Sequence, residues 1–112
     1  EKKYLPLKDY EDNDLYNRGG FFFKQLHIFT APFYYIDYTL AQICALQYFM
    51  RSRKEGDKAW QDYVALCKEG GSKPFLELVE LAGLKNPFLP ETIPGILPEI
   101  KAYLDSVDDT KL

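Results

Sequence analysis

The sequence PFYYIDYTLAQICALQY, residues 32–48, is the most apolar stretch of the chain and decides its fold. Thr30 can cap a helix here, and Pro32 suits the first turn because it has no N–H group to leave unpaired. The alanines and leucines that follow favour helix to about Met50. Because apolar residues lie on nearly every face, the stretch predicts one long, mostly buried, aromatic-rich helix.

Three tyrosines stand at the beginning of this predicted helix. Tyr34 and Tyr38 are four residues apart and Tyr35 and Tyr38 are three apart, so either pair can share a face. A buried phenol usually has a hydrogen-bond partner. The cluster therefore has two interpretations: hydroxyls bonded to backbone within a core helix, or donors that point into a cleft. From the pattern alone we favour the core helix.

The composition indicates one domain and excludes some classes of partner. The chain has 112 residues, of which 46% are hydrophobic and 16% aromatic, which is enough for one core. A net charge of −3 argues against a nucleic-acid-binding surface, which is normally strongly basic. Cys44 and Cys67 lie in apolar helical patterns, and one such pair is no disulfide framework. We therefore predict buried, reduced thiols and a cytoplasmic protein.

Residues 31–50 are long enough to cross a bilayer, but their polar members argue against it. Asp37, Gln42 and Gln47 lie inside the stretch, and an Asp at mid-membrane costs about 2.5–3.5 kcal/mol. We expect no membrane partner. The first residues, Glu-Lys-Lys-Tyr, have no apolar run after their charges, so we also expect no secretory signal. The abrupt start is typical of a segment of a longer protein.

The rest of the chain predicts shorter helices. Residues 21–29 are apolar on several faces, which fits a helix or a strand, and we expect a helix. A charged turn over residues 51–56 is expected to follow the long helix. Asp57 is then predicted to cap a helix over residues 58–69.

Two more helices are predicted near the C-terminus. Ser72 is expected to cap one that has Pro74 in its first turn and stops at Gly83. The last is expected from about Pro94 or Leu97 to Val107, before a frayed tail at residues 108–112. No alternating strand pattern of useful length is present, so the predicted class is all-α: a helical array around the long buried helix.

The sequence contains no complete catalytic or metal-binding motif. A zinc site needs three or four ligands at set spacings, whereas this chain has one histidine, His27, and two distant cysteines. No His-Glu-x-x-His, Ser-His-Asp or phosphate-cradling pattern is evident. A lone histidine in an apolar run is more often a core residue than a ligand, although His27 can also be a donor beside the tyrosines. These residues alone indicate an accessory part of a catalytic site or a helical module.

Several short motifs together are specific to one family. They are Gln25-x-His27-Ile28-Phe29, Pro32-Phe33-Tyr34-Tyr35-Ile36-Asp37-Tyr38-x-Leu40-Ala41-Gln42, Ala59-Trp60-x-Asp62-Tyr63, Gly70-Gly71-Ser72 and Ala82-Gly83-Leu84, with Tyr4-Leu5-Pro6 and Asp9-Tyr10 before them. With these motifs the chain resembles, over nearly its whole length, the C-terminal part of oligoendopeptidase F. That family is a branch of the thimet-type zinc metallopeptidases.

The resemblance implies a C-terminal helical portion of a larger, deep-clefted hydrolase that cleaves short peptides with a zinc-activated water. The family's His-Glu-x-x-His motif and third zinc ligand lie upstream of the matched region, and this chain departs from the whole-enzyme pattern by lacking them. We therefore expect residues 1–112 to contribute no metal ligand and to be metal-free and inactive alone. The zinc of the full-length enzyme would be held by the missing N-terminal part of the same protein, and the substrate would be an oligopeptide.

The resemblance also implies roles for four residues. Carried over by position, His27 matches the family's histidine opposite the metal, and Tyr38 matches the tyrosine that donates to the oxyanion. Tyr34 or Tyr35 would be the second, substrate-binding tyrosine, and we prefer Tyr34 because it lies four residues before Tyr38. Asp37 is expected to orient a neighbour.

Two other interpretations of the chain are open. It can be a stand-alone helical interaction module whose aromatic cluster forms a groove for a partner helix. It can also be a fragment that self-associates through the apolar surface that the rest of an enzyme would cover.

Overall fold

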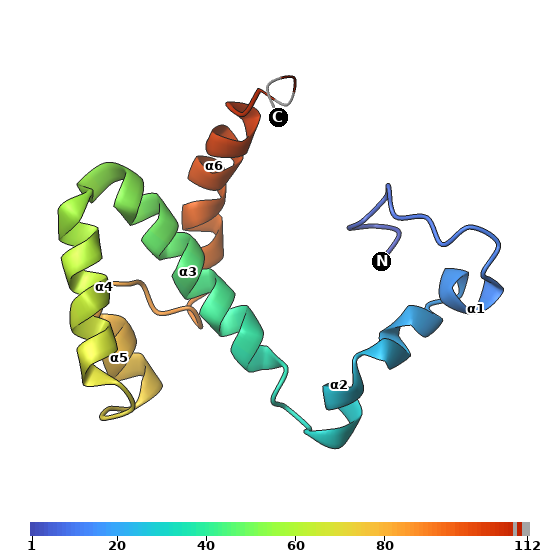
Figure 1. Ribbon diagram of the computed structural model, residues 1–112, viewed down its shortest axis with the longest axis horizontal. Helices are drawn as coiled ribbons and strands as arrows, with labels where there is room; N and C mark the ends of the chain where they lie inside the picture. Colours follow the sequence, from blue (N-terminus) through green and yellow to red (C-terminus); the bar gives the residue numbers. More distant parts are fainter. Residues whose placement is uncertain (109, 111–112) are drawn as a thin grey trace. The chain divides into compact units, whose positions relative to one another are not determined.

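The computed structural model describes residues 1–108 and residue 110, and this part of the chain is helical with no strand (Figure 1). The predicted all-α class is therefore confirmed. The chain forms two compact units, Glu1–Asp37 and Tyr38–Leu112. The frayed tail predicted at residues 108–112 lies largely outside the described residues.

None of the helices in the described part of the chain combines the length and the apolar character that a membrane span requires.

The first unit contains three short helical segments: α1 (Asp14–Asn17), the 3-10 helix η1 (Gly20–Lys24) and α2 (Leu26–Thr30). The Asn13 side chain caps α1 by accepting a hydrogen bond from the Tyr16 backbone N–H at 3.0 Å. The rings of Tyr10, Tyr16 and Phe21 pack together with centroids 5.2–5.6 Å apart. The helix predicted over residues 21–29 is thus confirmed, as two pieces divided at Gln25.

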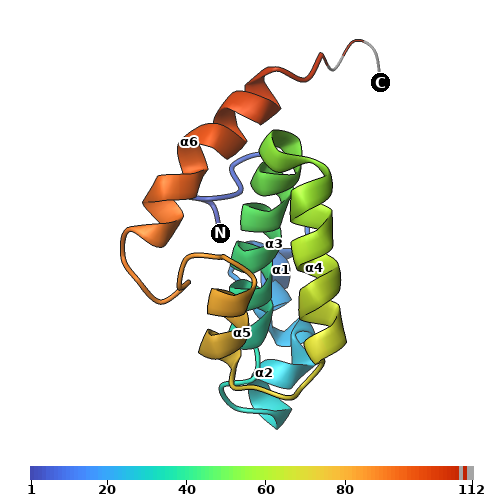
Figure 2. The ribbon, with the colours of Figure 1, turned by 90° about the vertical axis from the view of Figure 1, so that its left-hand side faces the viewer.

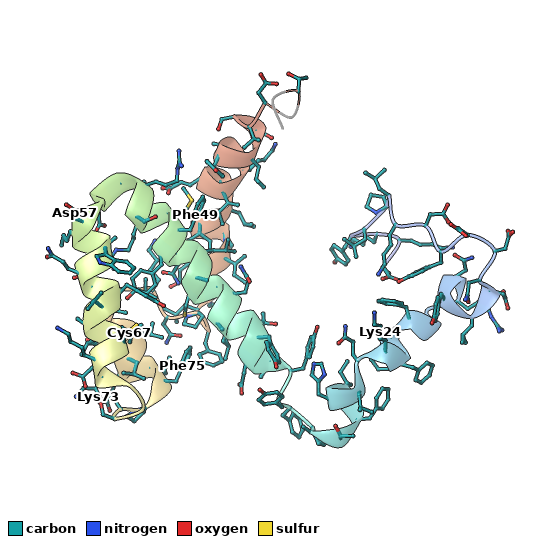
Figure 3. The ribbon with its side chains drawn as sticks, viewed as in Figure 1. Lys24, Phe49, Asp57, Cys67, Lys73 and Phe75 are labelled. Carbon is teal, nitrogen blue, oxygen red and sulfur yellow. The ribbon has the colours of Figure 1, made fainter. Side chains whose placement is uncertain are left out.

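The second unit is built around α3 (Ile36–Glu55), which is followed by α4 (Asp57–Glu69), α5 (Phe75–Leu81) and α6 (Thr92–Asp105). The chain reverses at Gly56, where φ is +54°. From there α4 runs back beside α3 in the view of Figure 2, and the view of Figure 1 shows that the two helices diverge with distance from Gly56. Phe49 of α3 packs against Tyr103 of α6 with ring centroids 5.0 Å apart (Figure 3). The turn predicted over residues 51–56 is wrong, because α3 continues to Glu55.

The beginning of α3 also differs from the prediction. Thr30 does not cap it: Thr30 is the last residue of α2, and its hydroxyl donates to the Leu26 carbonyl oxygen at 3.2 Å. Phe33 has φ +68°, which a right-handed helix cannot accommodate. The chain therefore makes a turn over residues 31–35, and α3 begins at Ile36.

The burial predicted for the long helix is wrong for the structure described here. Only Ile43 and Gln47 of α3 are buried, and most of its other side chains are at least partly exposed. The reason is that α4, α5 and the loop after α5 cover one stripe of α3 and α6 contacts it at Phe49, whereas the helix is apolar nearly all round. The core of the second unit consists of Ile43, Ala59, Val79, Ala82 and Ile96, with Gln47 and Thr92 as buried polar members.

The two C-terminal helices begin differently from the prediction. Ser72 does not cap α5, because its hydroxyl donates to the Glu69 carboxylate at 2.8 Å; Pro74 stands at the N-cap position instead. The predicted stop at Gly83 is confirmed, with φ +65° there. Helix α6 begins earlier, at Thr92, whose hydroxyl donates to the Asn86 carbonyl oxygen at 2.6 Å. Pro94 then lies in the first turn, where it costs no hydrogen bond.

Both cysteines are free thiols, as predicted. Cys44 is half-buried, but the prediction of a buried Cys67 is wrong because this side chain is exposed on α4 (Figure 3). The covered stripe of α4 runs through Ala59, Asp62 and Leu66, and Cys67 lies beside it.

Candidate functional site

His27 and Tyr35 form an aromatic pair within the first unit. Their ring centroids are 4.7 Å apart at an interplanar angle of 34°, and His27 is half-buried in α2. The turn that follows α2 makes this pairing possible: the Ala31 N–H donates to the His27 carbonyl oxygen at 3.0 Å, and the Tyr34 N–H to that of Ala31 at 3.2 Å. The chain thereby brings Tyr35 back against the helix that carries His27.

Tyr34 lies in this turn and not in α3. The helical four-residue relation to Tyr38, on which our preference for Tyr34 rested, is therefore wrong. The physical cause is the positive φ of Phe33, which keeps Tyr34 and Tyr35 out of the helix. Both tyrosines remain accessible, with 47% of Tyr34 and 42% of Tyr35 exposed.

Tyr38 belongs to the second unit and lies in the first turn of α3. Its side chain is 56% exposed, so this phenol is not a core residue of that unit. Asp37 precedes it, in the first turn of the helix, where a negative charge is favourable because the free N–H groups carry partial positive charge. The Asp37 N–H donates to the Tyr34 carbonyl oxygen at 3.1 Å, which ties the start of α3 to the turn.

Two polar side chains that the sequence analysis did not single out as functional connect α3 to the other helices of its unit. The Gln47 amide donates to the Lys85 carbonyl oxygen at 3.0 Å and accepts from the Lys85 N–H at 2.8 Å. Arg51 donates to the Ala82 carbonyl oxygen at 2.6 Å and forms ion pairs with Glu55, at 2.8 Å, and with Asp62. The sequence signal for these contacts was a pair of polar residues, Gln47 and Arg51, four positions apart in α3.

The Arg51 ion pairs change the ionisation of their members. The hydrogen bonds that Arg51 donates to Glu55 and Asp62 raise the pKa of Arg51 above its ordinary value. The Arg51 guanidinium lowers the pKa of Glu55 through its hydrogen bond to that carboxylate. Arg51 and Glu55 therefore stay charged at neutral pH, and the contacts of Arg51 join α3 to α4 and to the end of α5.

An apolar pocket of about 380 Å³ lies between α3, α4 and α5, lined among others by Cys44, Tyr48, Leu66, Phe75 and Leu78. The Tyr48 hydroxyl is buried and has no hydrogen-bond partner among the described residues. Burial raises the pKa of Tyr48, as it does that of Cys44. Neither group is therefore prepared to ionise near neutral pH.

Within residues 1–108 and 110, no three His, Cys, Asp or Glu side chains gather as ligands of a metal ion would. The described residues thus do not fit a zinc site of their own.

No protein-family model matches the chain, and no curated protein matches it either. Solved structures match it closely. A structure assigned to oligoendopeptidase F is 53% identical over 99% of this chain with a TM-score of 0.86, and PZ peptidase A with an inhibitor is 54% identical over 96% with a TM-score of 0.84. A structure assigned to oligoendopeptidase F from Bacillus anthracis is 58% identical over 73% with a TM-score of 0.67. The chain covers 20%, 19% and 15% of these three proteins, which is about a fifth of their length or less.

Proposed function

We propose that this chain, which belongs to the oligoendopeptidase F family and matches one segment of its longer members, supplies the histidine and tyrosine side of a peptidase cleft. The full-length protein would be a zinc metallopeptidase that hydrolyses short peptides. The observation that carries the proposal is an identity of 53% and 54% to two peptidase structures that match 99% and 96% of this chain, which contains the motif from Gln25 to Gln42.

Tyr38 is proposed to donate a hydrogen bond to the oxyanion. When water attacks a peptide carbonyl, negative charge develops on the carbonyl oxygen, and a donor already in place needs no reorganisation at that moment. The position of Tyr38 supports this role: the phenol stands on a helix, which is a rigid mount, and more than half of it is accessible.

His27 is proposed to hydrogen-bond the substrate backbone or the same oxyanion. The ring of Tyr35 packs against the imidazole and restricts its rotation, which favours one orientation. Tyr34 and Tyr35 are proposed to contact the peptide through their exposed surfaces. The zinc ion, which would act as a Lewis acid, is proposed to be bound by another part of the full-length protein.

The experiment is Tyr38→Phe in the full-length protein, assayed on a short peptide. Because the hydroxyl is proposed to bond the oxyanion, which forms only when water attacks, kcat is expected to fall about 10²–10³-fold with little change in KM. The control is Tyr103→Phe on α6. The phenylalanine ring keeps the contacts that Tyr103 makes with Phe49 and Arg53, so the kcat of this variant should stay near wild type. A wild-type kcat for Tyr38→Phe removes this residue from the mechanism.

A further inference from the structure

One stripe of α3 is fixed to the rest of the second unit over two helical turns. Ile43, Gln47 and Arg51 are spaced four residues apart and so follow one another along the same face. Ile43 and Gln47 are buried, and the Arg51 side chain is only 18% exposed. Through this stripe α3 contacts the loop between α5 and α6, the end of α5 and α4.

The two hydrogen bonds of Gln47 are the most directional part of this attachment. One amide side chain both donates to and accepts from the backbone of a single residue, Lys85, at 3.0 and 2.8 Å. A planar amide that makes two such bonds fixes its own position and rotation, whereas the apolar contact of Ile43 allows the helix to roll. Together with Arg51, which is bonded to Ala82 and Asp62 from the same stripe, Gln47 therefore restrains the rotation of α3 about its axis.

Tyr38 stands on the opposite side of the same helix. Nine residues separate it from Gln47, which at about 100° a residue is two and a half turns, so the two side chains leave the axis about 180° apart. The 56% exposure of Tyr38 and 6% exposure of Gln47 agree with this placement. The distance along the axis is about 13.5 Å at 1.5 Å a residue. A rotation of α3 about its own axis would therefore turn the Tyr38 side chain through the same angle.

We infer that Gln47 is a positioning residue for Tyr38: its paired hydrogen bonds to the Lys85 backbone help to fix the rotation of α3 and so the direction of the phenol. This inference rests on the proposed function, in which Tyr38 meets the reacting carbonyl oxygen. Gln47 itself touches no substrate.

The test is a double-mutant cycle on kcat in the full-length protein, with Gln47→Met, Tyr38→Phe and both together. Met has a similar volume but cannot bond Lys85. Because a displacement of order 1 Å can cost about 10²-fold, Gln47→Met is expected to lower kcat about tenfold or more with KM little changed. In the Tyr38→Phe background, where there is no hydroxyl to aim, the same substitution should lower kcat less than about twofold.

The cycle separates positioning from a general loss of stability. Residues more than about 7–10 Å apart with no shared partner usually act independently, so a mere structural effect would multiply with that of Tyr38→Phe. Multiplicative losses overturn the inference, and so does a wild-type kcat for Gln47→Met. If Tyr38→Phe alone keeps full kcat, it is the proposed function that fails.

Two further variants keep the result interpretable. Gln61→Met makes the same chemical change at an exposed position of α4 and is expected to keep wild-type kcat. If Gln47→Met does not fold, Gln47→Asn replaces it in the cycle. Asn keeps the amide on a side chain one methylene shorter and is expected to show the same dependence on the Tyr38 hydroxyl.

Discussion

At the scale of single residues, polar groups determine how the second unit is held together. Arg51 reaches Glu55, Asp62 and the Ala82 carbonyl oxygen, and so fixes three helices at one point. The sequence indicated neither this contact nor that of Gln47, because Gln47 was treated as part of an apolar helix and Arg51 as part of a charged turn. Their partners lie 31 and 38 residues away for the two backbone contacts, beyond any local pattern.

The Arg51–Glu55 pair predicts a dependence of stability on pH. Arg51 lowers the folded-state pKa of Glu55 below its ordinary value of 4.5. The pair's contribution is therefore present above that value and is lost as the pH falls through the lowered, folded pKa. In thermal unfolding of the full-length protein, Glu55→Gln should lower the midpoint at about pH 7, and this effect should shrink as the pH falls and the Glu55 carboxylate is protonated. A midpoint shift that does not change with pH would contradict the ion pair as its origin.

At the scale of helices, the stop of α5 at Gly83 was predicted well, whereas the end of α3 before Gly56 and its start after Phe33 were predicted poorly. Gly83 ends α5 as predicted, since glycine enters the left-handed region without strain. Phe33 adopts the left-handed conformation despite its side chain. As a result α3 begins at Ile36 and not at residues 30–32, where the sequence predicted its start. No sequence rule anticipates that choice for a phenylalanine, which is 94% exposed.

The stop at Gly83 predicts a difference between two glycine substitutions. Gly83→Ala should destabilise the protein by about 1–2 kcal/mol, because an L-residue is strained at φ +65° and its Cβ would lie 3.2 Å from Arg51 Nη1. Gly71→Ala is the matched control: no atom lies within 4 Å of the added Cβ and φ is not positive. Denaturant unfolding measures the free energy of unfolding of both variants. Equal values would contradict the strain that we expect for an L-residue at position 83.

At the scale of the whole molecule, the described part of the chain leaves much apolar surface exposed. Among the exposed large side chains are Phe22, Phe23 and Phe29, whose rings pack together, and Tyr38, Trp60 and Leu97 on the second unit. Apolar patches of this kind usually mark surfaces that contact other polypeptide. This agrees with a chain that covers about a fifth of the peptidases it matches.

The exposed surface predicts how residues 1–112 behave when expressed alone. We expect them to self-associate and to bind a hydrophobic dye, whereas the full-length protein, in which other polypeptide covers these side chains, should do neither. Sedimentation velocity at several concentrations measures the association. If residues 1–112 alone are monomeric and bind no dye, their exposed apolar side chains do not need to be covered by other polypeptide.

By itself the sequence determined the all-α class, the helices at residues 21–29 and 58–69, the stop at Gly83 and the resemblance to oligoendopeptidase F. These features depend on propensities, caps and motifs that neighbouring residues carry. Only the tertiary structure decided that Tyr34 and Tyr35 precede α3, that Tyr35 packs on His27, and that Gln47 is bonded to Lys85. Such features depend on a strained turn and on partners distant in the chain, whose free energy no local pattern contains.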